Sequence, residues 1–179
     1  MRRGRRASRI PRRADDVPRR AVLFVLAAVI AGVLLAVGLS SAGTKQGRRA
    51  PGLPRERIAG APTTLAALTR GRSAIVLFWA SWCEPCQREA AAVERFARGP
   101  GAGRIVTVDW SDSLPGARAF VRRYGWTMPV LRDPEGAVGY AYGLTGLPTT
   151  FVVDSSGHIA DELRGPQTET SLMQALQSG

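Results

Sequence analysis

The sequence predicts an α/β fold in which a mixed sheet is covered by helices on both faces. Short apolar runs rich in β-branched residues alternate with segments of helical periodicity through residues 74–142. Two further apolar runs then follow each other across a turn, and a helical segment closes the chain. Alternating strands and helices give parallel strand pairs, whereas a hairpin adds an antiparallel pair, so the expected sheet is mixed.

Local signals bound the individual elements. Residues 74–79 are all apolar, as in a buried strand. The segment 85–98 is followed by Gly99-Pro100-Gly101, which stops a helix, and the segment 115–124 carries apolar residues at helical spacing. In chain order we expect strand 74–79, helix 85–98, strand 104–109, helix 115–124, strand 129–131, a short helix 137–142, a hairpin of strands 149–153 and 159–163, and helix 169–176.

The first 42 residues differ in composition from the rest. Residues 1–20 hold nine arginines and two aspartates with few apolar residues, so we expect a basic, disordered tail. Ala21 to Leu39 is an unbroken run of apolar residues and glycines. As a helix this run would match the hydrocarbon core of a bilayer, roughly 30 Å thick. We therefore expect a transmembrane anchor over 21–42; a cleaved signal peptide is the alternative, because Ser40-Ser41-Ala42 offers small residues for cleavage.

The charges around this anchor indicate its orientation. The tail carries more basic residues than the stretch after the apolar run, so the positive-inside rule places the tail in the cytoplasm. No aromatic residue stands among the tail's arginines, which favours membrane lipid over nucleic acid as the partner of the N-terminal region. Residues 43–57 carry Gly, Pro and charge without periodicity and are expected to be a linker, followed by one domain over 58–179.

Cys83 and Cys86 are the only cysteines, and they stand between a predicted strand and the start of a predicted helix. Two cysteines at this spacing in a first helical turn can close a small disulfide. When they are reduced, the unpaired N–H groups and the helix dipole favour a thiolate at the first sulfur, and thiolate is the attacking species in thiol–disulfide exchange. We therefore expect Cys83 to be the nucleophile and Cys86 the resolving thiol, with Glu84 and Pro85 tuning the redox poise.

Two other interpretations of the cysteine pair are weaker. A structural disulfide at this spacing constrains little of the unfolded chain, so it would stabilise the fold only slightly. A zinc site needs about four ligands, whereas the chain has two cysteines and a single histidine, His158. We expect no metal and no cofactor, and we expect His158 to be a solvated residue.

The segment Phe78-Trp79-Ala80-Ser81-Trp82-Cys83-Glu84-Pro85-Cys86 resembles the active-site segment of thioredoxin-fold proteins. Among these it is most similar to the membrane-anchored thiol:disulfide oxidoreductases of the ResA/TlpA/CcmG type. A second segment, Gly146-Leu147-Pro148-Thr149-Thr150-Phe151, resembles the cis-proline strand of the same family. The resemblance covers about residues 58–179 and implies a thioredoxin-like fold with a central helix–strand insertion near 112–131.

The same resemblance implies roles for four further residues. Pro148, joined to Leu147 by a cis peptide bond, would lie beside the cysteine pair, where both residues would bind the substrate backbone. Trp82 would belong to the surface on which partners dock. Glu89 follows Cys86 by three residues on the same helix face and would accept a proton from the resolving thiol. The alternative for Glu89 is a solvated carboxylate paired with Arg88 or Arg95.

Together these features imply a membrane-tethered, extracytoplasmic thiol–disulfide oxidoreductase of the bacterial cytoplasmic membrane, with its N-terminus inside. The expected reaction is reduction of disulfides in exported proteins, with apocytochrome c as a candidate substrate and a membrane protein as electron donor. The same residues would serve an oxidase that forms disulfides, because the relative stability of thiolate and disulfide decides the direction. A peroxidase is disfavoured because Ala80 stands where that chemistry usually has threonine, and the two intact cysteines disfavour a non-catalytic binding module.

Overall fold

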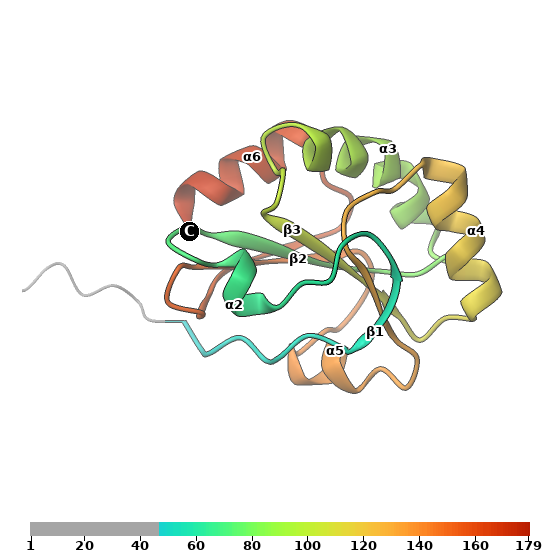
Figure 1. The fold of residues 1–179 in the computed structure, drawn as a ribbon, viewed down its shortest axis with the longest axis horizontal. Helices are drawn as coiled ribbons and strands as arrows, with labels where there is room; N and C mark the ends of the chain where they lie inside the picture. The colour runs from blue at the N-terminus through green and yellow to red at the C-terminus, as the bar shows by residue number, and fades with distance from the viewer. Residues whose placement is uncertain (1–46) are drawn as a thin grey trace, which may run out of the picture. The chain divides into compact units, whose positions relative to one another are not determined.

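A computed structural model describes residues 47–179, which form a six-stranded sheet with helices on both faces (Figure 1). The strand order is β1-β4-β3-β2-β5-β6, in which β2, β3 and β4 are parallel and the other neighbours pair antiparallel. The mixed sheet is therefore confirmed. In chain order the elements are β1 (Glu56–Ala59), α2 (Leu65–Leu68), β2 (Ala74–Trp79), α3 (Glu84–Arg98), β3 (Ile105–Trp110), α4 (Leu114–Tyr124), β4 (Val130–Asp133), α5 (Ala137–Ala141), β5 (Thr149–Val153), β6 (Ile159–Arg164) and α6 (Glu169–Ser178).

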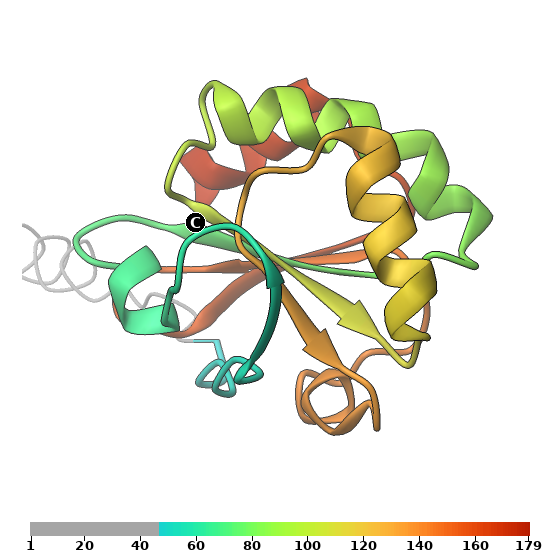
Figure 2. The same cartoon turned by 45° about the vertical axis from the view of Figure 1, so that its right-hand side comes forward.

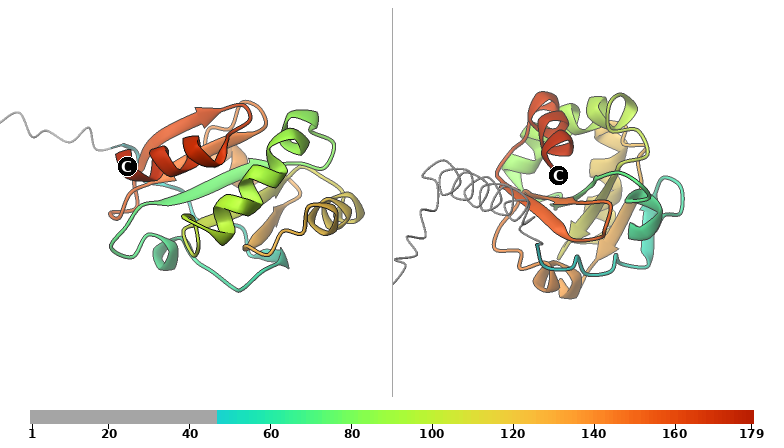
Figure 3. Two further views of the ribbon diagram at one scale, coloured as in Figure 1. Left: turned by 90° about the horizontal axis from the view of Figure 1, so that it is seen from above. Right: turned by 90° about the vertical axis from the view of Figure 1, so that its left-hand side faces the viewer.

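Strand β2 lies near the middle of the sheet and divides the core into two hydrophobic clusters. Its successive side chains point to opposite faces. Leu77 and Trp79 pack with residues of α3, α4 and α6, whereas Val76 and Phe78 pack with residues of α2 and with Tyr142, which follows α5. Figure 2 shows α3, α4 and α6 on one side of the sheet, and Figure 3 shows α3 and α6 side by side. Every residue of β2 is fully buried, as its apolar sequence predicts.

The structure differs from the expected elements mainly near the N-terminal end of the domain. Strand β1 and the single turn of α2 were not predicted, and β1 begins at Glu56, inside the stretch expected to be a linker. The residues before β1 also contact the domain: the Arg48 carbonyl accepts the N–H of Ile159 at 2.9 Å, and the Tyr142 hydroxyl donates to the Pro51 carbonyl at 2.8 Å. The Arg48 guanidinium group also donates to the carbonyls of Ala141 and Tyr142. Each of these bonds joins residues 91 or more positions apart, so local sequence patterns do not predict them.

Helix α4 and strand β4 occupy the stretch where the resemblance implied a helix–strand insertion. Strand β4 fits between β1 and β3 and so widens the parallel part of the sheet. Within residues 47–179 no helix is both long enough and apolar enough to cross a bilayer. The expected tail over 1–20 and the expected anchor over 21–42 lie outside the described residues.

Candidate active site

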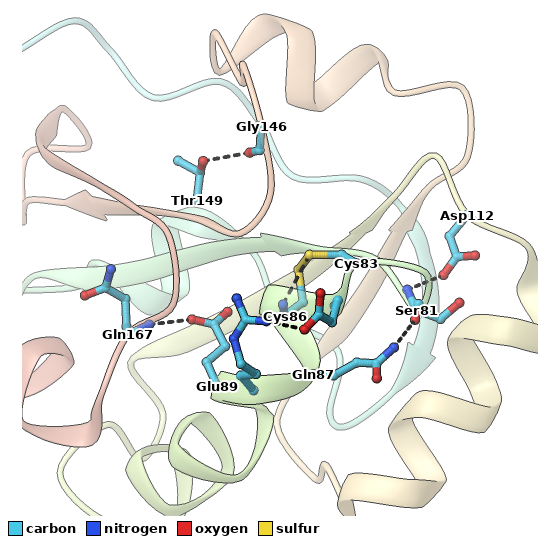
Figure 4. Close-up of a disulfide and its surroundings, with 11 residues drawn as sticks. Ser81, Cys83, Cys86, Gln87, Glu89, Asp112, Gly146, Thr149 and Gln167 are labelled. Atoms are coloured by element: carbon cyan, nitrogen blue, oxygen red, sulfur yellow. Dashed lines mark hydrogen bonds and ion pairs between the residues drawn. A yellow bond between two sulfur atoms is a disulfide. The ribbon is translucent and has the colours of Figure 1, made fainter.

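The cysteine pair lies just after β2, at the N-terminal end of α3. Cys83 is the N-cap of α3, and its sulfur accepts the N–H of Cys86 at 3.2 Å. The two residues form a disulfide (Figure 4) and are nearly buried, with 4% of Cys83 and 1% of Cys86 exposed. Pro85 lies in the first turn of the helix, where an amide N–H would have no intrahelical partner in any case.

This position has a chemical consequence for the reduced pair. A sulfur at the N-cap receives a backbone N–H and the positive end of a helix of 15 residues, and both favour the thiolate of Cys83 over its thiol. Cys86 lies one turn deeper, packed in the cluster between the sheet and α3. Glu84, between the cysteines, is exposed and pairs with Arg88 at 2.5 Å.

Three hydrogen bonds hold the loop between β2 and Cys83. The Ser81 N–H donates to a carboxylate oxygen of Asp112 at 2.6 Å, and the Ser81 carbonyl accepts the side-chain amide of Gln87 at 3.0 Å (Figure 4). The indole N–H of Trp82 donates to the carbonyl of Ser111 at 3.2 Å. Trp82 remains 59% exposed, so its ring lies at the surface beside Cys83.

The segment 146–148 lies beside the cysteine loop. The peptide bond between Leu147 and Pro148 is cis, which confirms the expectation. Thr149, the first residue of β5, pairs with Phe78 near the C-terminal end of β2. The residues just before Thr149 therefore lie close to that end of β2. Pro148 is buried and Leu147 is half-buried.

A hollow of about 470 Å³ connects the two segments. Its lining includes Trp82, Cys83, Glu84 and Pro85 from the cysteine segment, and Thr145, Gly146 and Leu147 from the segment before Pro148. Three further lining residues were not predicted from the sequence: Trp110 at the end of β3, Tyr140 in α5 and Leu144 in the loop after α5. Tyr140 is 67% exposed and stands edge-on to Trp110, with 5.8 Å between the ring centroids. The opening beside Cys83 is therefore aromatic, with room for a peptide segment.

Glu89 is buried rather than solvated. Only 3% of the residue is exposed; one carboxylate oxygen accepts the N–H of Gln167 at 2.7 Å, and the other has no hydrogen-bond partner among the described groups (Figure 4). Burial raises the pKa of Glu89 to about 8, against the smaller lowering effect of the Gln167 N–H. The alternative pairing is wrong, because Arg88 pairs with Glu84 and Arg95 with Glu169.

His158 lies in the β5–β6 turn, away from this site. Its backbone N–H donates to the Asp154 carboxylate at 2.9 Å, and its ring contacts the Ser156 hydroxyl at 2.8 Å. The residue is partly exposed, and its backbone N–H helps to close the turn.

A thioredoxin-like sheet that presents a Cys-x-x-Cys disulfide at a helix N-terminus, beside a cis-proline, defines the class of thioredoxin-like thiol–disulfide oxidoreductases. Comparison with known proteins agrees and identifies the family. The chain belongs to the AhpC/TSA family, whose model matches residues 46–162.

Several curated relatives carry names that describe thiol–disulfide exchange. The thiol:disulfide interchange protein DsbE of Allochromatium vinosum is 40% identical over 54% of this chain and 53% of its own length. HelX of Rhodobacter capsulatus, also a thiol:disulfide interchange protein, is 37% identical over 69% of this chain and 70% of its own. The thiol-disulfide oxidoreductase ResA of Bacillus thuringiensis is 30% identical over 60% of this chain and 63% of its own. The chain thus spans between 53% and 70% of the length of these relatives.

A solved structure supports the same class. A thiol:disulfide interchange protein of the thioredoxin family from Chlorobium tepidum superposes with a TM-score of 0.62 at 28% identity, over 73% of this chain and 94% of the other. The resemblance to thioredoxin-like oxidoreductases that the two sequence segments indicated is therefore confirmed.

Proposed function

We propose that this protein is a membrane-tethered thiol–disulfide oxidoreductase that reduces disulfides in exported proteins. One observation carries the proposal: the Cys83–Cys86 disulfide opens, through Cys83, into an aromatic hollow that is also lined by Gly146 and Leu147. A disulfide whose first sulfur meets a peptide-sized opening is placed for exchange rather than for stapling the fold, since its short loop adds little stability.

The exchange begins with the reduced pair. The Cys83 thiolate attacks one sulfur of a substrate disulfide, forms a mixed disulfide and releases the other substrate sulfur as a thiolate. Cys86 then loses its proton, and its thiolate attacks the Cys83 sulfur. The second substrate sulfur leaves, so two electrons have passed to the substrate and the Cys83–Cys86 disulfide has formed. A donor must return two electrons before the next cycle.

Glu89 is proposed as the group that takes the proton of Cys86. It lies one helical turn after Cys86, and its pKa of about 8 is close to that of an ordinary thiol, about 8.5. Proton transfer between groups of similar pKa is nearly balanced in free energy, which suits a reversible step. Trp82, Leu147 and Pro148 are proposed to hold the substrate segment, and Glu84 and Pro85 to tune the potential.

The substrate and location follow from the resemblance and from the N-terminal composition. Apocytochrome c is the candidate among exported proteins, and a membrane protein is the proposed electron donor. Residues 21–42 are proposed to anchor the chain in the cytoplasmic membrane of a bacterium, with the basic tail inside and the domain outside.

The reduction potential tests the direction. The full-length protein is equilibrated in defined thiol buffers, and the free thiols of Cys83 and Cys86 are trapped and counted. A potential near that of thioredoxin, about −270 mV, supports a reductase, whereas one near −120 mV makes the protein a disulfide-forming oxidase. A Cys86→Ser variant is the companion test, because it should accumulate a mixed disulfide with the substrate through Cys83.

A further inference from the structure

The described chain begins with a short extended segment, residues 47–51, which we call the strap. The Ile159 N–H donates to the Arg48 carbonyl, and the Ala50 N–H donates to the Gly157 carbonyl, both at 2.9 Å. These two bonds hold the strap along the turn between β5 and β6, as in an antiparallel strand pair. The strap is therefore part of the folded domain, and its remaining contacts can act on the site.

The side chain of Arg48 reaches the end of helix α5. The last carbonyls of a helix have no partner within the helix. Around the end of α5, backbone N–H groups satisfy three carbonyls, those of Val138, Gly139 and Tyr140. Arg48 donates to the next two: its Nη1 to the Ala141 carbonyl at 3.0 Å and its Nη2 to the Tyr142 carbonyl. An arginine that binds the last carbonyls in this way caps the C-terminus of the helix.

Tyr142 gives the strap a second contact with the same region. Its hydroxyl donates to the Pro51 carbonyl at 2.8 Å. Its ring is buried and packs against Phe78 of β2 and Phe151 of β5, with 5.1 Å between the ring centroids in each pair. A polar group inside the protein needs a hydrogen-bond partner, and here the strap supplies it. The strap thus holds both the carbonyl end of α5 and the side chain that follows the helix.

Helix α5 also forms a wall of the hollow beside Cys83. Tyr140 in the helix and Leu144 just after it are lining residues. The start of α5 is held separately, because the indole N–H of Trp110 donates to the Gly136 carbonyl at 3.2 Å. The helix has only five residues, so its position depends on such contacts rather than on its own stability. The two lining residues therefore lie between a helix start held by Trp110 and a helix end held by the strap.

We propose that Arg48 is a positioning residue for substrate binding: by capping α5 it keeps Tyr140 and Leu144 in place on the wall of the hollow. This role rests on the exchange activity proposed above. It applies to reduction and to oxidation alike, because a peptide substrate enters the same hollow in both directions. Cys83 lies on a different segment with hydrogen bonds of its own. Loss of the cap should therefore weaken substrate binding and leave the chemistry of the sulfur atoms unchanged.

Hydrogen exchange in the oxidised full-length protein tests the cap without any turnover. Arg48→Ala removes the two bonds to the helix end, so the N–H groups of Tyr142 and Leu144 should exchange about tenfold faster. Arg49→Ala is the matched control, because it removes the same charge from the exposed neighbouring residue, and it should leave these rates unchanged. Unchanged rates in Arg48→Ala, or an equal acceleration in both variants, would overturn the proposal.

Steady-state kinetics separate positioning from a purely structural role. In Arg48→Ala the KM for a peptide with one intramolecular disulfide should rise severalfold, while kcat and the reduction potential stay near wild type. Tyr142→Phe removes the bond to Pro51 but keeps the buried ring, and it should raise the same KM. Normal turnover with an unchanged KM in both variants overturns the positioning role alone. A wild type that exchanges no disulfide refutes the proposed function together with it.

Discussion

The burial of Glu89 predicts a pH-dependent stability that the substitution Glu89→Gln should reduce. The carboxyl group is enclosed between α3 and the segment before α6, and its pKa rises from 4.5 to about 8 in the folded protein. The folded protein therefore binds this proton more tightly than the unfolded chain does. The resulting stabilisation is complete below about pH 4.5 and is lost as the pH rises through about 8.

The size of the effect follows from the shift. Between the two pKa values, one such group changes the free energy of unfolding by about 1.4 kcal/mol per pH unit. From pH 6 to pH 8, where the curve levels off, Glu89 should account for a loss of about 2 kcal/mol. The pKa of Asp109 rises from 3.8 to about 8 in the folded protein, so Asp109 adds a loss of stability of the same sign and similar size. The wild type should lose about 4 kcal/mol over this range and Glu89→Gln about 2 kcal/mol.

Urea unfolding of the oxidised protein at pH 6, 7 and 8, followed by tryptophan fluorescence, measures these differences. Glu84→Gln is the matched control, because Glu84 lies on the same helix but is exposed, and it should leave the pH dependence of stability unchanged. If Glu89→Gln loses stability as steeply as the wild type, the pKa of Glu89 in the fold is close to 4.5. Its carboxylate would then be too weak a base to draw the proton from a thiol whose ordinary pKa is about 8.5.

Three other changes probe the site. Gly116→Ala should lower stability in thermal or urea unfolding by about 1 kcal/mol, because a Cβ at this position would lie 2.5 Å from the Ser81 hydroxyl oxygen and 2.9 Å from that of Ser113, the N-cap of α4; wild-type stability would mean that these hydroxyls rotate away at no cost. Tyr140→Ala removes an exposed ring from the hollow, so steady-state kinetics should show a raised KM for a disulfide-bearing peptide, while the reduction potential stays unchanged; an unaltered KM would exclude this wall from binding. Cys83→Ser should abolish mixed-disulfide formation on non-reducing gels, and any remaining adduct would mean that Cys86 attacks first.

The parts of the fold that the sequence predicted well are those with local signals. The apolar run of β2 and the Gly-Pro-Gly stop after α3 each depend on a few adjacent residues, and both elements appear where expected. The same holds for the cysteine pair and the cis peptide before Pro148, which belong to short motifs. Strand β1 was missed because its four residues include two charged ones, and its strand character comes from pairing with β4.

The environment of the site depended on contacts between distant residues. Residue spacing alone did not decide whether Glu89 is solvated or buried. In the structure it is buried against Gln167, which lies 78 residues further along the chain and donates its N–H to the Glu89 carboxylate. Trp110 and Tyr140 meet only because β3 and α5 end beside the cysteine loop. Asp112 lies 31 residues from Ser81, and nothing local in the sequence links the two. The sequence motifs therefore identified the reacting sulfur atoms, but they did not identify the residues that surround these atoms and hold the loop in position.

The contact between Arg48 and β6 limits how far the proposed anchor lets the domain travel. Five residues separate Arg48 from the end of that anchor at residue 42. Fully extended, this stretch of chain reaches only about 20 Å. If residues 21–42 anchor the chain as proposed, the Cys83–Cys86 pair would stay close to the membrane surface. It would then meet a membrane-embedded electron donor by diffusion along the bilayer rather than through bulk solution.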